Sequence, residues 1–391
     1  MNRGENPFRI HGVVEGEYFT DRADEVARIV KTFREPASKL LVYGPRRMGK
    51  TSAILRAIAR HQKEGGVAFL ADLSTASTLA DAANRILEAA GQELGRRWKD
   101  SLQDLIRAIG IKVSLTPDTA TGIIVPSLEV GLRSAPPDEQ RESLSRTLDA
   151  IETLARERKA TIGVALDEFQ EIERLGGEAS EWHLRGIIQR HQHVSYVLSG
   201  SESHVIERML DKGRAFYGLA DQMAFGPIEE AHLAAWIDDQ MTRAGVKAAS
   251  IGALIVERAR PRTRDVVQVA RQCFDRCTLT GVATPVDVER AIGDVVAEQE
   301  APFRLVWSRL TPAQQNVLRA VAENREGLTT GDSIARYGFT SSGAASRAAG
   351  ALVEQGILVK ADAPAGYAFD NLFFGLWVRQ AALGDLGAGV G

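Results

Sequence analysis

Short apolar runs and longer amphipathic stretches alternate through the first half of the chain. This alternation is typical of strands that are buried on both faces and of helices that cover them. Apolar runs predict strands at residues 40–43, 67–73, 161–166, 194–198 and 223–225. Amphipathic periodicity predicts helices near residues 26–33, 52–58, 78–90, 98–109, 140–158 and 181–190. The first half is therefore expected to be an α/β domain.

One segment departs from this alternation. Residues 111–130 alternate apolar and polar side chains on both sides of a turn-rich centre, which predicts a β-hairpin. Pro126 has no backbone N–H to donate, so it restricts one arm of the hairpin to an edge position. We expect this hairpin to be an insertion in the α/β domain.

The second half of the chain is predominantly helical. Helices are predicted near residues 229–244, 248–259, 263–279 and 285–300, and then at 311–323, 331–337 and 341–355. Two short strands, at 356–360 and 366–369, follow the last helix. Three helices with a terminal hairpin form the outline of a winged helix-turn-helix. The predicted domains are therefore residues 1–227, a helical domain at 228–303, and a winged helix at 304–391.

Candidate chemistry begins where the first strand meets the next helix. Residues 44–51 fit the phosphate-binding pattern G-x-x-x-x-G-K-[ST], in which the glycine-rich backbone presents its N–H groups to a phosphate. Lys50 is predicted to reach the β- and γ-phosphates, and the Thr51 hydroxyl to join the Mg²⁺ shell. The alternative is an ordinary glycine-rich turn. The predicted nucleotide-binding residues of this loop are Gly44, Pro45, Arg46, Arg47, Met48, Gly49, Lys50, Thr51 and Ser52.

A second landmark is the Asp-Glu pair that ends the apolar run at residues 161–166. Asp167 is expected to hold Mg²⁺ and Glu168 to orient or deprotonate the attacking water. Ser199 and Ser201, at the end of the next strand, are candidate γ-phosphate sensors. Asp72 also ends a strand, but capping the following loop is an equally good role for it.

Composition and charge narrow the classes of partner. The 391 residues carry a formal net charge of −3, with 25% charged and 44% hydrophobic residues, which argues against disorder and against a global basic field for nucleic acid. No apolar run is long enough for a signal peptide or a membrane span, so we expect a cytoplasmic protein without membrane contact. Cys273 and Cys277, four residues apart on a predicted helix, are expected to be buried apolar side chains.

Taken together, these motifs resemble the prokaryotic AAA+-related ATPases of the archaeal type, in the class of signal-transducing (STAND) P-loop NTPases. The matching residues include the Asn-Pro-Phe start, the loop at 44–51, Leu166-Asp167-Glu168-Phe169-Gln170 and Leu198-Ser199-Gly200-Ser201. The resemblance implies a parallel five-stranded sheet with the P-loop strand beside the sensor strand, a helical lid and a winged helix.

The resemblance also implies further site residues. Phe19 and Arg22 would line an adenine pocket, and Pro261 with Arg264 would belong to the lid's contribution to the nucleotide site. A solvated helix face is the equal alternative for Arg264. Relatives often carry Tyr-Gly-Arg where this chain has Tyr217-Gly218-Leu219, so an arginine finger is not assigned, and Arg208 and Arg214 remain candidates.

The leading function is an ATP-binding and ATP-hydrolysing molecular switch that uses ATP, ADP and Mg²⁺ and couples nucleotide state to a partner through its lid and winged helix. The alternatives are an ATP-controlled DNA-binding regulator or mobile-element accessory protein, and a nucleotide-dependent scaffold with little hydrolysis. Residues 310–391 carry six basic and seven acidic side chains, and Arg347 is the one base in the presumed recognition helix at 341–355. Because phosphate contacts need several bases, a protein partner or self-association is favoured over DNA.

Overall fold

The computed structural model describes residues 5–10, 20–98, 101–109, 113–117, 124–128, 134–201, 203–248, 250–323 and 327–382. The chain divides into two compact units. One unit comprises His11–Glu229 with Arg262–Arg264, and the other comprises Met1–Ile10, Glu230–Pro261 and Asp265–Gly391. The division into three domains, with boundaries after residues 227 and 303, stays a prediction.

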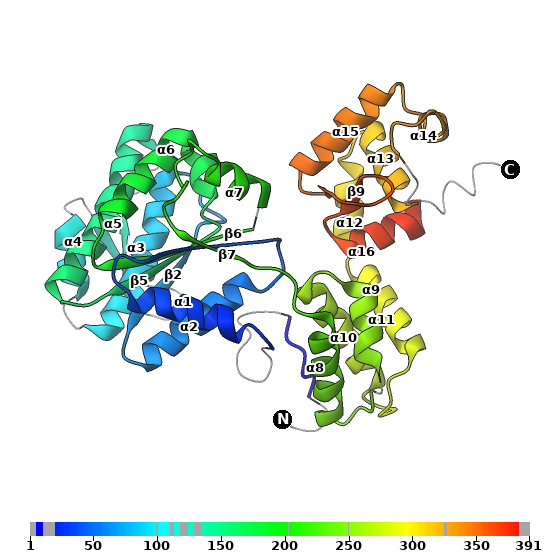
Figure 1. Ribbon diagram of the computed structural model, residues 1–391, viewed down its shortest axis with the longest axis horizontal. Coiled ribbons are helices and arrows are strands. Elements are labelled where there is room, and N and C mark those ends of the chain that lie inside the picture. Colours follow the sequence, from blue (N-terminus) through cyan, green and yellow to red (C-terminus); the bar gives the residue numbers. More distant parts are fainter. Residues whose placement is uncertain are drawn as a thin grey trace. The chain divides into compact units, whose positions relative to one another are not determined.

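A five-stranded parallel sheet forms the centre of the first unit (Figure 1). Its strands are β1 (Lys39–Tyr43), β2 (Val67–Asp72), β5 (Ile162–Asp167), β6 (Val194–Gly200) and β7 (Asp221–Ala224), in the order β2-β5-β6-β1-β7. All neighbours pair in parallel. The predicted fold class is therefore confirmed, including a first strand that lies beside β6. Parallel pairing also brings the carboxyl ends of all five strands to one edge.

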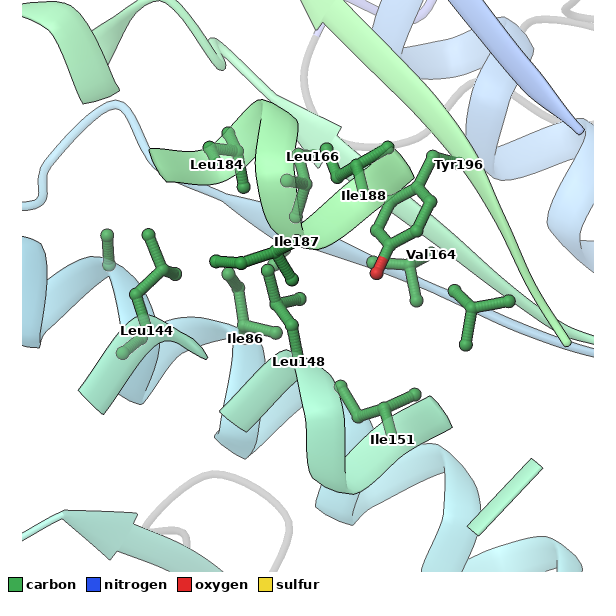
Figure 2. Packing of buried hydrophobic residues seen from close by; sticks show 14 of the residues in the cluster. Ile86, Leu144, Leu148, Ile151, Val164, Leu166, Leu184, Ile187, Ile188 and Tyr196 are labelled. Carbon is green, nitrogen blue, oxygen red and sulfur yellow. The ribbon is translucent and has the colours of Figure 1, made fainter. Parts of the chain in front are cut away.

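Helices cover both faces of the sheet. α1 (Ala23–Arg34) and α2 (Lys50–Lys63) pack on one face, while α3 (Leu79–Arg97), α5 (Pro137–Glu157) and α6 (Glu171–Arg190) pack on the other. Figure 2 shows leucine and isoleucine side chains of α3, α5 and α6 packed against Val164, Leu166 and Tyr196 of the strands. Because every residue of β5 and β6 is buried, these two strands form a rigid support for the residues that follow them.

The remaining elements of this unit follow the sequence prediction except for the helix after β6, which was not predicted, and for the start of α6. α4 (Ser101–Ile109) follows α3, and α7 (Ser203–Leu210) follows β6. β3 (Val113–Pro117) and β4 (Ile124–Leu128) pair antiparallel, with Leu115 opposite Pro126, as the alternating pattern predicts. α6 begins at Glu171, ten residues before the predicted start. Gly177, with φ of 66°, interrupts its helical geometry. The spacing of apolar residues did not predict the half of the helix that precedes this interruption.

The second unit begins with helices near the predicted positions: α8 (Glu230–Arg243), α9 (Ile251–Ala259), α10 (Thr263–Cys277) and α11 (Pro285–Glu298). Phe8, from the N-terminal segment, is fully buried in an edge-to-face contact with Trp236 and beside Phe274. Cys273 and Cys277 are free and buried, as predicted. Burial raises the pKa of the Cys273 thiol to about 12, so it is not a reactive thiolate.

The winged helix follows as α12 (Glu300–Ser308), α13 (Pro312–Ala322), α14 (Gly331–Tyr337) and α15 (Ser342–Glu354). Strands β8 (Leu358–Lys360) and β9 (Tyr367–Phe369) form the wing, and α16 (Leu372–Trp377) continues into a π-helical turn at Val378–Ala382. Phe374 and Trp377 are buried against Phe303. The aromatic residues at the end of the chain therefore form this domain's own core.

Candidate active site

The loop after β1 owes its shape to two glycines with different constraints. The Phe225 N–H donates to the Tyr43 carbonyl at 2.7 Å, which brings the backbone after β7 against the start of the loop. A Cβ at Gly44 would lie 2.2 Å from the Phe225 carbonyl oxygen, so a side chain has no room there. Gly49 has a φ of 93°, a left-handed conformation that favours glycine, so the backbone rather than a close neighbour selects glycine there.

Lys50, at the first position of α2, is buried with 6% of its surface exposed. Its Nζ donates to the Gly44 carbonyl at 2.7 Å and to the Pro45 carbonyl at 2.8 Å, so the ammonium group lies within the curve of the loop. Burial lowers the pKa of the Lys50 ammonium to about 8, and the Glu168 and Asp167 carboxylates oppose that fall. A nearby anion would therefore stabilise the charged form.

Thr51 and Asp167, which are 116 positions apart in the sequence, meet at the carboxyl edge of the sheet. The Thr51 hydroxyl donates to Asp167 Oδ2 at 2.6 Å, and the Glu168 N–H donates to Asp167 Oδ1 at 3.1 Å. Burial raises the pKa of Asp167, while the Thr51 hydroxyl opposes the rise. Ser199 also lies near enough to lower that pKa. Its buried oxygen nevertheless makes no hydrogen bond of good geometry among the described residues.

Glu168 occupies a left-handed conformation with φ of 51° directly after β5. Its Oε2 accepts hydrogen bonds from Gln170 Nε2 at 2.5 Å, from the Ser201 hydroxyl at 2.7 Å and from the Ser201 N–H at 3.3 Å. Arg46 Nε donates to the same Ser201 hydroxyl at 3.2 Å. Sequence reasoning assigned no role to Gln170. Its position two residues after the acidic pair, at the start of a helix, is the signal that could have found it.

Other predicted residues of the loop lie as follows. Met48 is buried, Pro45 and Arg46 are exposed, and Ser52 is half-buried. Arg47 has a φ of 69°, and its carbonyl accepts a hydrogen bond from the Arg264 N–H at 3.2 Å. The backbone of Arg264 is thus brought to the loop. Pro261 belongs to the other unit, so its part in the site stays a prediction.

The structure describes only one of the two residues that were predicted to line an adenine pocket. Phe19 lies outside the described residues. Arg22 is buried, donates to Glu25 at 2.8 Å and to the Gly226 carbonyl at 2.5 Å, and places its guanidinium 4.2 Å from the centre of the Phe225 ring. These contacts hold the start of α1 against the segment after β7. A role of Arg22 in adenine binding stays a prediction.

Three further acidic or basic candidates have partners elsewhere. Asp72 lies opposite Asp167 in the sheet, but its Oδ1 accepts the Ser74 N–H at 2.8 Å, which is the capping role. Arg208 pairs with Glu173 of α6 at 2.8 Å. Arg214 pairs with three glutamates of the same helix, Glu173, Glu178 and Glu181. Both arginines therefore brace α6.

The chemistry of this donor set fits a nucleoside triphosphate with Mg²⁺. The Lys50 ammonium lies within the curve of the loop, and Thr51 and Asp167 supply the hard oxygen ligands that Mg²⁺ prefers. The buried Ser199 hydroxyl, which lowers the pKa of Asp167, is a further polar group at this place. Within the described ranges, no three His, Cys, Asp or Glu side chains group as metal ligands. An ion here would therefore take its other ligands from phosphate and water.

Comparisons with known families agree with this geometry. Residues 19–230 match a family described as an ATPase domain predominantly from Archaea. Residues 301–380 match a family described as a probable winged helix domain. No curated protein has a significantly similar sequence. Among the described residues, no helix is both long and apolar enough to cross a membrane.

Solved structures share the fold along nearly the whole chain. A Walker-type ATPase of Pyrococcus abyssi is 17% identical, with a TM-score of 0.63 over 95% of this chain and 99% of that one. The ORC1 protein of Aeropyrum pernix, solved in complex with DNA, is 16% identical, with a TM-score of 0.53 over 96% and 97%. The ORC2 protein of the same organism, in its ADPNP-ADP complexes, is 15% identical, with a TM-score of 0.50 over 94% and 96%.

Proposed function

Because the chain belongs to the family of ATPase domains found predominantly in Archaea, we propose that it binds ATP with Mg²⁺ and hydrolyses it as a molecular switch. The observation that carries this proposal is the 2.6 Å hydrogen bond between the Thr51 hydroxyl and Asp167, next to the buried Lys50. It brings the phosphate-binding loop and the acidic strand end together, and these are the two parts that would hold Mg²⁺ during phosphoryl transfer.

Each residue has a distinct part in this proposal. The backbone of residues 44–51 and the Lys50 ammonium bind the phosphates, and the charge of Lys50 offsets the charge that develops during transfer. Thr51 and Asp167 would hold Mg²⁺, which when bound neutralises phosphate charge. Glu168 accepts a proton from the attacking water through a carboxylate oxygen. Ser199 would donate to a phosphate oxygen, since its hydroxyl has no other bond of good geometry among the described residues.

The proposed output is a protein contact made by the winged helix, as in a signal-transducing STAND switch. Three of its arginines are engaged inside the domain: Arg336 pairs with Glu323 at 3.1 Å, Arg379 donates to the Ala322 carbonyl at 3.1 Å, and Arg319 lies over the Trp307 ring. Because these arginines already contact groups within the domain, they are less available to bind DNA phosphates.

A DNA-binding regulator is the second candidate, and the helix-turn-helix of α14 and α15 with its wing is the observation that favours it. A fluorescence-anisotropy titration of the full-length chain against duplex DNA at near-physiological salt separates the two. Saturable binding at nanomolar concentration would favour the DNA-bound regulator, whereas weak or absent binding supports a protein partner.

The enzymatic part is tested by a phosphate-release assay with and without Mg²⁺. We expect turnover that chelation by EDTA abolishes. Glu168→Gln should keep ATP affinity and lose turnover, because an amide can contact the water but cannot take its proton. Asp167→Asn should instead lose the Mg²⁺-dependent part of the affinity. Wild-type turnover of the Glu168→Gln protein would contradict the assignment of the base.

A further inference from the structure

The two oxygens of the Glu168 carboxylate have unequal surroundings. Oε2 accepts three hydrogen bonds, from Gln170 Nε2 and from the hydroxyl and the N–H of Ser201. No described residue donates to Oε1, and the side chain is only partly buried. One oxygen is therefore fixed by the protein while the other remains available to water.

The backbone around Glu168 is held in place as well. A left-handed conformation at a glutamate is energetically unfavourable and persists only where the surroundings enforce it. Here the Phe169 N–H donates to the Ser199 carbonyl at 2.9 Å, and the Glu171 N–H donates to the Glu168 carbonyl at 3.0 Å. The end of β6 thus fixes both the turn that carries Glu168 and, through Ser201, its side chain.

Gln170 is a buried amide whose nitrogen donates a hydrogen bond but whose oxygen accepts none from the described residues. It is 3% exposed, and its Oε1 has no hydrogen-bond partner among the residues that the structure describes. A Cβ at Gly200 would lie 2.7 Å from that oxygen, so the absence of a side chain there leaves room for the amide. A buried polar atom without a partner costs stability, which an apolar residue of the same size would avoid. Within the described ranges, the amide thus carries one unpaired oxygen, while its Nε2 donates to the Glu168 carboxylate.

We propose that Gln170 and Ser201 are positioning residues for the hydrolysis proposed above, on which this inference rests. They hold Oε2 of Glu168 so that Oε1 is presented to the attacking water. In that step the water oxygen bonds to the γ-phosphorus while its proton passes to Oε1. The bond from the γ-phosphorus to the bridging oxygen breaks, and its electron pair leaves with ADP. The contact from Arg46 to Ser201 connects this arrangement to the phosphate-binding loop.

The first test is steady-state phosphate release by the full-length Gln170→Met protein, with Mg²⁺ and ATP. Methionine has a similar volume but cannot donate a hydrogen bond. We expect kcat to fall by about tenfold or more, since a small misplacement of a catalytic group has effects of this size. KM should stay within about twofold, because ground-state binding is untouched. The Tm should not fall, because the substitution also removes the unpaired oxygen.

Two comparisons separate positioning from loss of structure. Ser201→Ala should lower kcat in the same way, and Ser201→Thr, which keeps the hydroxyl, should restore most of it. Gln240→Met is the matched control, since Gln240 is a buried glutamine of α8 in the other unit. It should leave kcat unchanged. If Gln170→Met does not fold, the Ser201 pair still decides the matter.

The double variant Glu168→Gln with Gln170→Met completes the test. If Gln170 acts through Glu168, the residual rate of phosphate release should be the same in the double variant as in Glu168→Gln alone. An unchanged kcat in both Gln170→Met and Ser201→Ala, with Glu168→Gln inactive, overturns the positioning role and leaves the proposed function intact. Wild-type turnover of Glu168→Gln overturns the proposed base and this inference with it.

Discussion

Nucleotide affinity should depend on pH through Lys50, because burial holds the pKa of this ammonium near 8 before an anion arrives. A bound phosphate opposes that effect and returns the pKa toward its ordinary value. Binding therefore takes up about half a proton near pH 8 and nearly a whole proton at higher pH, so the affinity must fall as the pH rises. Below pH 7 the lysine is charged in both states and contributes no pH dependence.

The size of the effect follows from the shifted pKa. At pH 9 about one tenth of the free protein carries the charged lysine. The dissociation constant for ATP should therefore be roughly tenfold larger than at pH 7. This corresponds to about 1.4 kcal/mol of binding free energy per pH unit above 8. Isothermal titration calorimetry in two buffers of different ionisation enthalpy should show roughly half a proton taken up at pH 8 and nearly one at pH 9.

Lys50→Arg provides the matched control, because a guanidinium keeps its charge throughout this range. Its affinity should be weaker than that of the wild type but nearly independent of pH. Equal affinity of the wild-type protein at pH 7.5 and pH 9.5 would refute the reasoning. The same slope in the Lys50→Arg protein would also refute it, since the titrating group would then lie elsewhere.

Three further substitutions test the structure around the site. Gly44→Ala places a Cβ against the Phe225 carbonyl and should cost about 1–3 kcal/mol in urea unfolding, with loss of ATP binding. Arg214→Met removes the ion pair of the fully buried Glu181 and should cost about 3–5 kcal/mol. Burial already raises the pKa of Glu181, so in this variant stability should recover as the pH falls; a flat pH profile would argue against it. Burial lowers the pKa of His61, whose ring nitrogens have no hydrogen-bond partner in the described part of the chain, so unfolded chains bind more protons below pH 6.5 and stability falls there. His61→Phe should lessen that loss in thermal unfolding at pH 5, and an unchanged loss would assign it to other groups.

The sequence predicted those parts of the fold whose signals are local. The strands β1, β2, β5 and β6 are recognisable because nearly every residue is apolar, which only a doubly covered strand permits. The order of the strands is not local information, and the resemblance implied only that the strand before the phosphate-binding loop lies beside the strand that ends in Ser199. The first half of α6 escaped prediction because Gly177 leaves the helical conformation, although the backbone on both sides remains helical.

The same distinction applies to the site. Lys50 and Thr51 were predicted because the phosphate-binding pattern is defined by spacing along the chain, and Asp167 because it directly follows an apolar run. The contact between Ser201 and Glu168 depends on two neighbouring strand ends and on a left-handed glutamate, a conformation that residue type does not predict. The aromatic residues near the end of the chain could have served either a protein-binding surface or the core of the winged helix, and residue type alone does not decide between the two. In the structure, Phe374 and Trp377 pack against Phe303, because a small domain needs large side chains to fill its core.

The burial of Phe8 has a consequence for how the chain acquires its structure during synthesis. Phe8 leaves the ribosome early, whereas its ring partners, Trp236 and Phe274, are more than two hundred positions further along the sequence. At translation rates of ~5–20 residues per second, the phenylalanine waits roughly 10–50 s before both partners exist. During that interval the nucleotide-binding unit can complete its sheet independently, since all five strands are synthesised before Trp236. The helical unit, in contrast, cannot close its core until the segment at residues 5–10 returns from the opposite end of the nascent chain.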